Sequence, residues 1–523
     1  MRFTVPLAYR RLGPRLPFSQ PLGRRQLSTA PRRTVAQLQD WKPEIEVKDV
    51  VVHGYVRSVR NMKTNRFVHV GDGSSRTPIQ AHVSRSHEES PNLRVGAAVR
   101  LRGSWVPSAA EGQSHELKVE HVEVLGPSDA MTYPIQKKYQ TPDYLRTMPH
   151  LRSRIPLNAA ILRLRSEAVA VLNRFFASRD FVQTHPPIIT SSDCEGAGEV
   201  FNVTTGSAET SQVPTADQHK EFFRSPKYLT VSSQLHLEAL AQSLGHVWTL
   251  SPTFRAERSD TSRHMSEFYM LEAEMSFVDE LDEVMDLVED MLGSLATGLY
   301  QTRAAQELLQ RRASGKGRTA DDDLVPKDEV ERRWLGMMPQ STSRWPRIKY
   351  ADAIKLLQAE QQRFDIKPTW EGGLQSEHEK FLAKALGTAN GTGPYTPVFV
   401  THYPQEIKAF YMRKSNPSVV ASDQPGPTVD CFDLLVPDLC EIAGGSMREH
   451  RLTDLLETMK SRGMDSSSAT GDDLSWYVDL RRWGSNPHGG FGVGFDRLLS
   501  YLVGVTNVRD VVAFPRWFGR CDC

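Results

Sequence analysis

The sequence predicts an α+β protein in which a small N-terminal β-barrel precedes a larger domain of mixed strands and helices. Two patterns in the 523-residue chain support this prediction. Residues 47–127 hold short runs rich in β-branched residues, broken by Gly, Asn and Asp, without a long helical pattern. Over residues 151–523, amphipathic helical patterns are mixed with strand-like runs. We therefore expect two folded domains joined by a linker over 128–150, which is punctuated by proline.

The first domain is predicted from five strand-like runs, which are residues 50–56, 67–70, 79–83, 98–102 and 117–124. Their spacing of roughly 10–20 residues is typical of a small all-β barrel. Five is the strand number of the oligonucleotide-binding (OB) barrel, and a generic barrel fits the pattern equally well.

The segment before the barrel, residues 1–33, holds eight arginines and no Asp or Glu. It lacks the roughly 7–15-residue apolar core of a secretory signal. This composition is typical of a mitochondrial presequence, and a basic RNA-binding arm is the alternative. Without the segment the chain holds 56 Lys and Arg against 63 Asp and Glu, a net charge near −7. Any polyanionic partner must therefore be bound by locally concentrated positive charge.

The second domain begins with apolar residues at helical spacing over 158–178, which predict an amphipathic helix. An acidic amphipathic helix is predicted over 279–298, with Asp279 as its N-cap. Residues 311–346 are charged and lack periodicity, so they are predicted to be an insertion or a flexible excursion, as are residues 414–427.

Composition excludes several classes of protein. Apolar residues make up 39% of the chain and aromatic residues 8%, which excludes wholesale disorder. No stretch approaches the roughly 18–20 uninterrupted apolar residues of a membrane span, so no membrane association is expected. The five cysteines lack the spacing of zinc ligands, and reduced thiols are expected.

A polar loop within residues 254–274 separates two strand-like runs. Alternation puts Arg255 and Glu257 on one face of the incoming strand. The basic or aromatic residues that follow are Arg263, His264 and Phe268. Clustered guanidinium groups suit polyphosphate or carboxylate, because the planar fork bonds oxyanions in pairs, and an aromatic ring offers a base a stacking surface. For the charge pattern alone, a solvated hairpin held by salt bridges is the alternative.

A glycine-rich run at residues 489–498 is predicted to be a tightly packed strand that leads into a helix beginning at Asp496. It lacks the third Gly and the downstream acidic residue of a dinucleotide-binding loop, and the chain holds no GxxxxGK[ST] phosphate loop. Arg497, in the first turn of the helix, is expected to lie near an anionic ligand.

Asp433 and Glu441 flank a turn between two apolar strands. Mg²⁺ prefers oxygen ligands and is usually bound by one or two carboxylates together with nucleotide phosphates. The pair is therefore a candidate Mg²⁺ site, and an ordinary surface turn explains the pattern equally well.

In this order, the stretches resemble the three signature motifs of class II aminoacyl-tRNA synthetases. Asp180–Ile189 is similar to motif 1, the helix and strand of the dimer interface, whereas residues 254–274 resemble motif 2 and residues 490–498 resemble motif 3. The resemblance covers about residues 47–523 and implies a catalytic domain with an antiparallel sheet flanked by helices. It also implies a homodimer. A preceding OB barrel marks the aspartate, asparagine and lysine subgroup, in which the barrel binds the tRNA anticodon.

Within this subgroup the chain resembles the asparaginyl-tRNA synthetases. The stretches that are similar to that family are residues 191–199, 403–413 and 514–516. Aspartate enzymes carry a Lys three positions after the Gln of a Ser-Pro-Gln-Leu segment, whereas Leu237 stands there in this chain and Glu238 follows. A buried cation facing an amide lacks a charge partner, whereas a carboxylate accepts the amide N–H. The exchange favours asparagine as the substrate.

The resemblance implies ligation of asparagine to its tRNA through an asparaginyl-adenylate, which is made from ATP with Mg²⁺. The residues it implies for ATP are Arg255, Glu257, Arg263, His264, Phe268, Glu441 and Arg497, with Arg255 and Arg497 also catalytic. Those implied for asparagine are Glu195, Gln234, Glu238 and Arg448. Those implied for Mg²⁺ are Asp433 and Glu441, and those for the anticodon are Phe67 and Gln80.

Three other functions are less consistent with the sequence. An aspartyl-tRNA synthetase, including a non-discriminating one, is disfavoured by Leu237. A non-catalytic, RNA-binding synthetase paralogue is disfavoured because the arginines of motifs 2 and 3 are present. A tRNA-free, amide-forming ligase on the same fold is disfavoured by the barrel. The composition of residues 1–33 places the expected enzyme in the mitochondrial matrix.

Overall fold

The computed structural model describes residues 33–108, 112–136, 138–191, 200–204, 222–223, 225–310, 318–339, 344–388, 391, 393–416, 424–464 and 474–523. Two compact units divide the chain, namely Met1–Ser74 with Pro78–Met131, and Ser75–Thr77 with Thr132–Cys523. Apart from Arg33, the predicted presequence lies outside the described residues, and so does Glu195.

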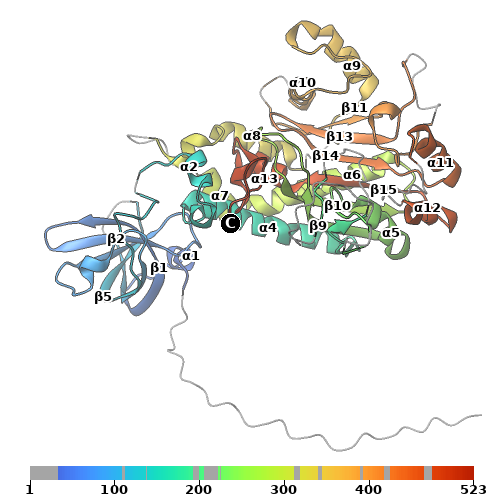
Figure 1. The fold of residues 1–523 in the computed structure, drawn as a ribbon. Coiled ribbons are helices and arrows are strands. Elements are labelled where there is room, and N and C mark those ends of the chain that lie inside the picture. The colour runs from blue at the N-terminus through green and yellow to red at the C-terminus, as the bar shows by residue number, and fades with distance from the viewer. Residues whose placement is uncertain are drawn as a thin grey trace, which may run out of the picture. The chain divides into compact units, whose positions relative to one another are not determined.

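The first unit is a closed barrel with the strand order β1-β2-β3-β5-β4 (Figure 1). Its strands are β1 (Val47–Asn61), β2 (Asn65–Gly71), β3 (Ile79–Ser84), β4 (Ala98–Pro107) and β5 (His115–Gly126). Helix α1 (Val35–Asp40), capped by Thr34, precedes them, and the short helix η1 (Ser90–Asn92) lies between β3 and β4. Alternate strand residues point inward and fill the barrel, among them Val52, Val68, Ala81, Leu101 and Leu117. The predicted five-stranded barrel is confirmed.

The second unit is built on an eight-stranded sheet with the order β11-β12-β13-β14-β15-β10-β9-β6. Its strands are β6 (Val182–Gln183), β9 (His246–Phe254), β10 (Glu267–Ser276), β11 (Arg347–Lys349), β12 (Val398–Thr401), β13 (Cys431–Val436), β14 (Cys440–Met447) and β15 (His488–Gly494). Neighbours are antiparallel, except that β11 pairs parallel with β12 and β6 with β9 at the two edges. β7 (Ile189–Thr190) and β8 (Tyr228–Leu229) form a separate pair.

Helices flank this sheet, as predicted. They are α2 (Pro142–Arg146), α3 (Pro149–Arg152), α4 (Pro156–Ala177), α5 (Gln234–Leu244), α6 (Leu281–Tyr300), α7 (Arg303–Leu309), α8 (Lys327–Met337), α9 (Tyr350–Ala359), α10 (Ser376–Gly387), α11 (Leu452–Ser461), α12 (Ser475–Arg482) and α13 (Phe495–Val503). The shorter 3₁₀ elements are η3 (Ala320–Asp323), η4 (Gln361–Arg363), η6 (Gln405–Ile407) and η7 (Val508–Asp510). Among the described residues, no helix is long and apolar enough to cross a lipid bilayer.

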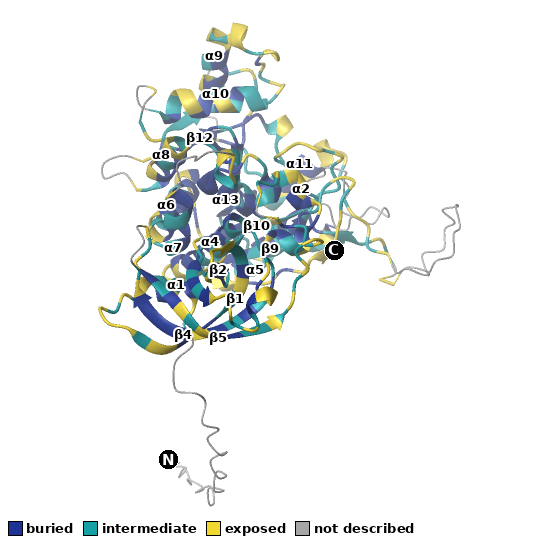
Figure 2. Ribbon diagram, turned by 90° about the vertical axis from the view of Figure 1, so that its left-hand side faces the viewer, coloured by how far each residue is buried: buried dark blue, intermediate teal, exposed yellow. Residues whose placement is uncertain are grey.

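The main core lies between the sheet and the helices α4, α6 and α13, which Figure 2 shows largely in the dark blue of buried residues. Alternation along β10 turns Leu271 and Ala273 into this core. Glu272 and Glu274 therefore project from the opposite face of the sheet. The fold thereby supplies a rigid floor on which charged side chains are held away from the apolar core.

Two sequence predictions need correction. Helix α6 is capped by Glu280 rather than Asp279, because the Glu283 carboxylate accepts the main-chain N–H of Glu280 at 3.3 Å and closes the first turn after it. The described part of 311–346 is not a loose excursion, since α8 buries its apolar face and Trp334 Nε1 donates to the carbonyl of Leu502 at 2.7 Å. The many charged residues on the outer face of α8 obscure the helical spacing of its apolar residues in the sequence.

Candidate active site

Two adjoining cavities lie on the face of the sheet that carries Glu272 and Glu274. The outer cavity has a volume of about 170 Å³ and the inner cavity about 180 Å³. The residues that line both are Arg255, Met270, Glu441 and Gly492. A larger cavity of about 1430 Å³ beside the start of α6 is lined by none of the predicted site residues. The chemistry predicted from the sequence therefore belongs to the two smaller, connected spaces.

The outer cavity collects every residue predicted to bind ATP. These are Arg255, Glu257, Arg263, His264, Phe268, Glu441 and Arg497. Arg255 follows directly on β9, and its guanidinium carbon lies 5.6 Å from the centre of the Phe268 ring on β10. The side chain of Arg255 is 29% exposed and that of Glu257 is 37% exposed. These groups are thus positioned by the hairpin yet remain open to a ligand.

The loop between β9 and β10 also carries the guanidinium group of Arg263 and the imidazole of His264. Arg263 Nη2 donates to Ser376 Oγ at 2.7 Å, and its Nη1 donates to Cys440 Sγ at 2.9 Å. His264 Nε2 lies 3.7 Å from a carboxylate oxygen of Glu257, and burial lowers the pKa of His264. The two hydrogen-bond acceptors of Arg263 are therefore neutral, and the Glu379 carboxylate interacts electrostatically with its charge.

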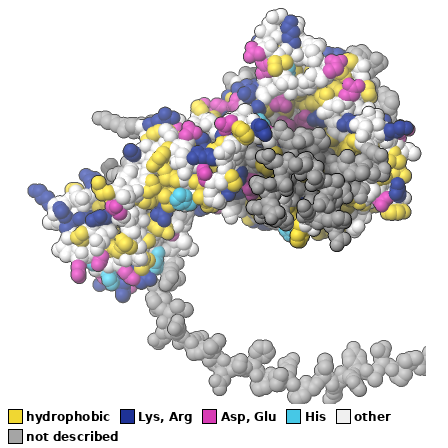
Figure 3. All heavy atoms as spheres, in the orientation of Figure 1, with side chains coloured by type: hydrophobic (Ala, Val, Ile, Leu, Met, Phe, Trp, Pro, Cys, Tyr) yellow, Lys and Arg dark blue, Asp and Glu magenta, His cyan; other side chains and the backbone are white. Residues whose placement is uncertain are grey.

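The outer cavity is closed on its far side by the start of α13. Arg497 Nη1 donates to the main-chain carbonyl of Glu441 at 3.2 Å, again a neutral acceptor. Three guanidinium groups, from Arg255, Arg263 and Arg497, consequently face one small space. Such an arrangement binds a polyanion, because each planar group bonds two oxyanion oxygens. On the face seen in Figure 3, described Lys and Arg side chains are interspersed with Asp and Glu, so this gathering of positive charge is local.

Asp433 and Glu441 meet where the two cavities join. A methyl group built on Gly444 would lie 3.5 Å from Asp433 Oδ1 and 3.2 Å from Glu441 Oε1, so both carboxylates reach the same spot. Burial first, and Asp433 second, raise the pKa of Glu441. Lys408 Nζ donates to both carboxylate oxygens of Asp433, at 2.8 and 2.7 Å. The described residues form no cluster of three or more metal-ligating side chains. A pair of repelling carboxylates nevertheless fits Mg²⁺, which takes its remaining ligands from phosphates and water.

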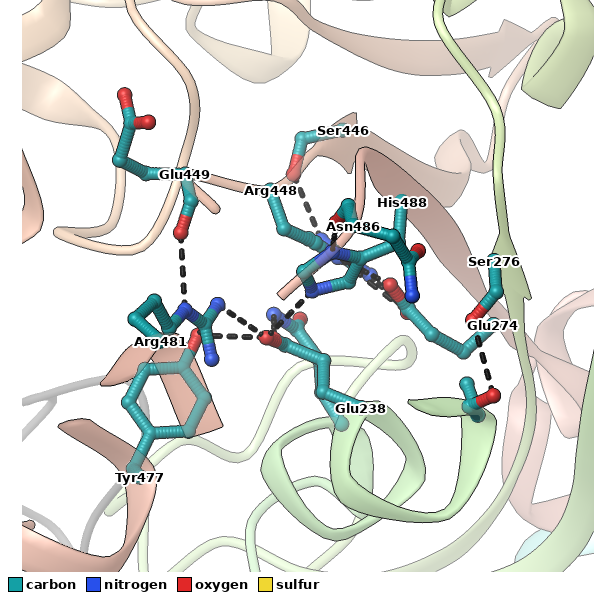
Figure 4. A network of polar contacts seen from close by, with 12 residues as sticks. Glu238, Glu274, Ser276, Ser446, Arg448, Glu449, Tyr477, Arg481, Asn486 and His488 are labelled. Atoms are coloured by element: carbon teal, nitrogen blue, oxygen red, sulfur yellow. Dashed lines mark hydrogen bonds and ion pairs between the residues drawn. The ribbon is translucent and has the colours of Figure 1, made fainter. Parts of the chain in front are cut away.

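The inner cavity is lined by charged groups that already have protein partners. Arg448 binds Glu274, with Nη2 donating to Oε2 at 2.9 Å and Nε donating to Oε1 at 3.1 Å (Figure 4). Their side chains are 3% and 1% exposed. Glu272 accepts from Ser233 N at 2.9 Å, and burial raises its pKa. The cavity therefore offers directed hydrogen-bonding groups but little net charge.

Two residues predicted to contact the amino acid are placed differently from one another. Gln234, at the start of α5, lines the inner cavity together with Leu237. Glu238 does not line it, and its side chain is completely buried against Arg481 and His488. The prediction that Glu238 accepts the substrate amide is therefore corrected. Leu237, in contrast, stands at the cavity wall as expected.

Sequence reasoning missed Glu272 and Lys408, both of which line the inner cavity. The signal for Glu272 was available, because it alternates with Glu274 among the apolar residues of β10. A carboxylate in a buried strand needs partners and therefore marks either an ion pair or a binding site. Lys408 had no comparable local signal, since its partner Asp433 is 25 residues away.

The barrel presents the two predicted anticodon residues on one surface. Phe67 on β2 precedes a buried residue, and Gln80 on β3 lies between two, so both are turned away from the interior of the barrel. The ring of Phe67 stacks on that of His82, with centroids 5.3 Å apart, and Gln80 Nε2 donates to Glu116 Oε2 at 2.9 Å. The barrel thus offers an aromatic ring and an amide on adjacent strands, as a base-stacking and base-reading surface requires.

Residues 142–518 match the family model described as tRNA synthetases class II (D, K and N), and residues 50–125 match that of an OB-fold nucleic acid binding domain. The chain is 39% identical over 495 residues to the asparagine–tRNA ligase of Nostoc, across 93% of this chain and 98% of that protein. It is 39% identical to the mitochondrial asparagine–tRNA ligase of Saccharomyces cerevisiae, across 92% and 95% of the two chains. Its structure is similar to that of asparaginyl-tRNA synthetase from Pyrococcus horikoshii complexed with asparaginyl-adenylate, with a TM-score of 0.76, 26% identity and coverage of 94% and 99%.

Proposed function

Because this chain belongs to the asparaginyl-tRNA synthetase family, we propose that it ligates asparagine to tRNA with ATP. The observation that carries the proposal is the junction of the two cavities at Arg255. The outer cavity suits a nucleotide polyphosphate and the inner cavity suits a small polar amino acid. An α-phosphate and an amino-acid carboxylate bound in these cavities would meet beside the same guanidinium group.

The first step joins the two substrates. The asparagine carboxylate attacks the α-phosphorus of ATP, and pyrophosphate leaves. Arg255 holds the α-phosphate and the attacking carboxylate together, while Arg263, His264 and Arg497 hold the pyrophosphate tail. Phe268 stacks under the adenine, and Glu257 contacts its edge. Acceleration here comes from positioning and from stabilising charge on the phosphoryl oxygens.

Mg²⁺ is proposed to bind between Asp433 and Glu441. Two carboxylates with overlapping reach and a raised pKa at Glu441 support this site. When bound, the ion supplies positive charge to the phosphates. Lys408 orients Asp433 through two hydrogen bonds.

Selection of asparagine is proposed to rest on the neutral character of the inner cavity. Arg448 donates to the side-chain carbonyl of the substrate, and Glu272 accepts its amide N–H. Gln234 accepts from the α-ammonium group. An aspartate carboxylate in this position would face Glu272 and would meet an arginine whose charge Glu274 already balances. The alternative of an aspartyl-tRNA synthetase is for this reason not favoured.

In the second step the terminal ribose hydroxyl of the tRNA takes the asparaginyl group, and AMP leaves. Phe67 and Gln80 on the barrel are proposed to stack on and read an anticodon base. A homodimer is proposed to form through Asp180–Ile189, where Val182 and Ile188 are 43% and 39% exposed. Similarity to a mitochondrial relative and the acid-free, Arg-rich residues 1–33 support a place in the mitochondrial matrix.

ATP–pyrophosphate exchange with asparagine and aspartate in parallel tests this proposal. We expect exchange with asparagine and at least about 100-fold less with aspartate, followed by charging of organellar asparagine tRNA. Exchange with aspartate alone would point to the aspartate enzyme. Absence of exchange with either amino acid, in a folded protein that binds tRNA, would point to a non-catalytic paralogue.

A further inference from the structure

Four donors converge on the buried carboxylate of Glu238. Figure 4 shows the three that meet at one of its oxygens. At Oε2 it accepts from the Tyr477 hydroxyl at 2.7 Å, from Arg481 Nη2 at 2.6 Å and from His488 Nε2 at 3.2 Å. At Oε1 it accepts from Gln234 Nε2 at 3.0 Å. Both oxygens of Glu238 thus have protein donors, and the fully buried side chain does not line the inner cavity.

This arrangement decides which end of the Gln234 amide faces the inner cavity. A carboxylate can only accept hydrogen bonds, so the amide nitrogen of Gln234 must be the atom turned toward Glu238. The carbonyl oxygen is then left for the cavity, which Gln234 lines. An ammonium group can only donate, so it binds to that oxygen and is repelled by an amide turned the other way.

The same network also anchors the other side of the inner cavity. Arg481 Nε donates to the carbonyl of Glu449 at 3.0 Å, and the backbone N–H of Arg448 donates to the carbonyl of His488 at 2.9 Å. The residues that hold Glu238 therefore bracket Arg448 as well. Gln234 and Arg448 are consequently fixed relative to each other by groups that lie behind the cavity wall.

We propose that Glu238 is a positioning residue that orients the Gln234 amide toward the α-ammonium group of the amino acid, and so sets the affinity for asparagine without touching it. This inference rests on the proposed function. The competing interpretation is that Glu238 only balances the buried charge of Arg481 and contributes to folding alone.

The test compares asparagine with succinamic acid, which is asparagine without its ammonium group. The variants are Glu238→Gln, Gln234→Ala and their combination, each assayed by ATP–pyrophosphate exchange. In Glu238→Gln the new amide donates to Gln234, which turns the Gln234 N–H groups toward the ammonium. We expect the KM for asparagine to rise about 10- to 100-fold in each single variant, while the inhibition constant of succinamic acid changes less than about threefold. The combination should be no worse than the more damaging single variant.

Two controls keep the result decisive. Arg482→Gln alters the exposed neighbour of Arg481 on α12 and should leave both constants unchanged. If Glu238→Gln fails to fold because Arg481 loses its partner, Glu238→Asp keeps the negative charge but withdraws the acceptor from Gln234, and should show the same selective loss.

Equal weakening of asparagine and succinamic acid would overturn the inference, and so would an unchanged KM for asparagine. Failure of the unaltered protein to catalyse exchange would instead count against the proposed function, before any variant is compared.

Discussion

The two cavities of the active site treat charge in opposite ways. In the inner cavity, Arg448 is paired with Glu274, and both side chains are almost fully buried. In the outer cavity, the acceptors of Arg263 and Arg497 among the described residues are neutral atoms, and Arg255 lies 4.0 Å from a carboxylate but remains 29% exposed. The difference follows the ligands that we propose. A neutral side chain needs a balanced, preformed pocket, whereas a polyphosphate brings the charge that completes its site.

This contrast predicts that outer arginines matter for catalysis and hardly at all for folding. Arg255→Ala or Arg497→Ala should lower asparagine-dependent ATP–pyrophosphate exchange by about 10²- to 10³-fold, because each removes a charge that stabilises the transition state. The melting temperature should stay within about 2 °C of the unaltered protein. Arg482→Ala, a surface change, serves as the control. Normal exchange in either variant would contradict the proposed roles.

The buried ion pair of the inner cavity, in contrast, is expected to contribute to stability as well as to catalysis. Glu274→Gln leaves Arg448 buried without its counter-charge, and loss of one partner of a buried pair costs about 3 kcal/mol of unfolding free energy. Urea denaturation measures that loss of unfolding free energy. ATP–pyrophosphate exchange should also fall, because Arg448 is no longer held in position by Glu274. Glu274→Gln combined with Arg448→Met should recover much of the stability and none of the activity. If the single change left stability intact, the cavities would not differ as described.

Glu379 on α10 interacts electrostatically with the two carboxylates at the junction of the cavities and gives an effect of intermediate size that depends on pH. Burial first, then the charges of Glu441 and Asp433, raise the pKa of Glu379 from 4.5 to about 7. Between these values the folded state holds a proton that the unfolded state has lost, so stability falls as the pH rises from about 4.5 to 7. Without Mg²⁺, the free energy of unfolding should fall between pH 5 and pH 8 in both proteins, and by about 2 kcal/mol less in Glu379→Gln than in the unaltered protein. Parallel pH profiles would exclude Glu379 as the source.

The contrast also explains which parts of the site could be predicted from the sequence. The outer cavity is built mostly on one strand–loop–strand segment, in which alternation placed Arg255 and Glu257 on one face. The resemblance to class II synthetases supplied the rest of the set, including Arg497 from a distant segment. Glu238 was assigned wrongly, because residue type shows that a carboxylate can accept but not which donors reach it. Its partners Tyr477 and His488 lie 239 and 250 residues further along the chain. No local pattern shows that Glu238 is buried by these distant residues. In the fold it therefore supports Gln234 and does not contact the substrate.

Helix α8 shows the same limit at the level of the fold. Charged residues dominate its sequence, and the apolar stripe consists of only a few side chains, including Val330 and Trp334. The stripe can be recognised in the structure, where Trp334 donates a hydrogen bond to a carbonyl of α13. The barrel strands, in contrast, carried their own period of two and were predicted correctly.

The smallest predicted effect concerns Arg263, which donates hydrogen bonds from both terminal nitrogens of its guanidinium group. Cys440→Ala removes the sulfur that accepts from Arg263 Nη1 and should raise the KM for ATP about threefold, because a weak acceptor is lost and the charge remains. Cys440→Ser keeps an acceptor and should lie closer to the unaltered value. The KM for asparagine should not change in either variant, since Cys440 lines neither cavity. An equal rise in the KM for asparagine and for ATP would mean that a change in β14 affects both cavities. The outer and inner cavities would then not be independent binding sites.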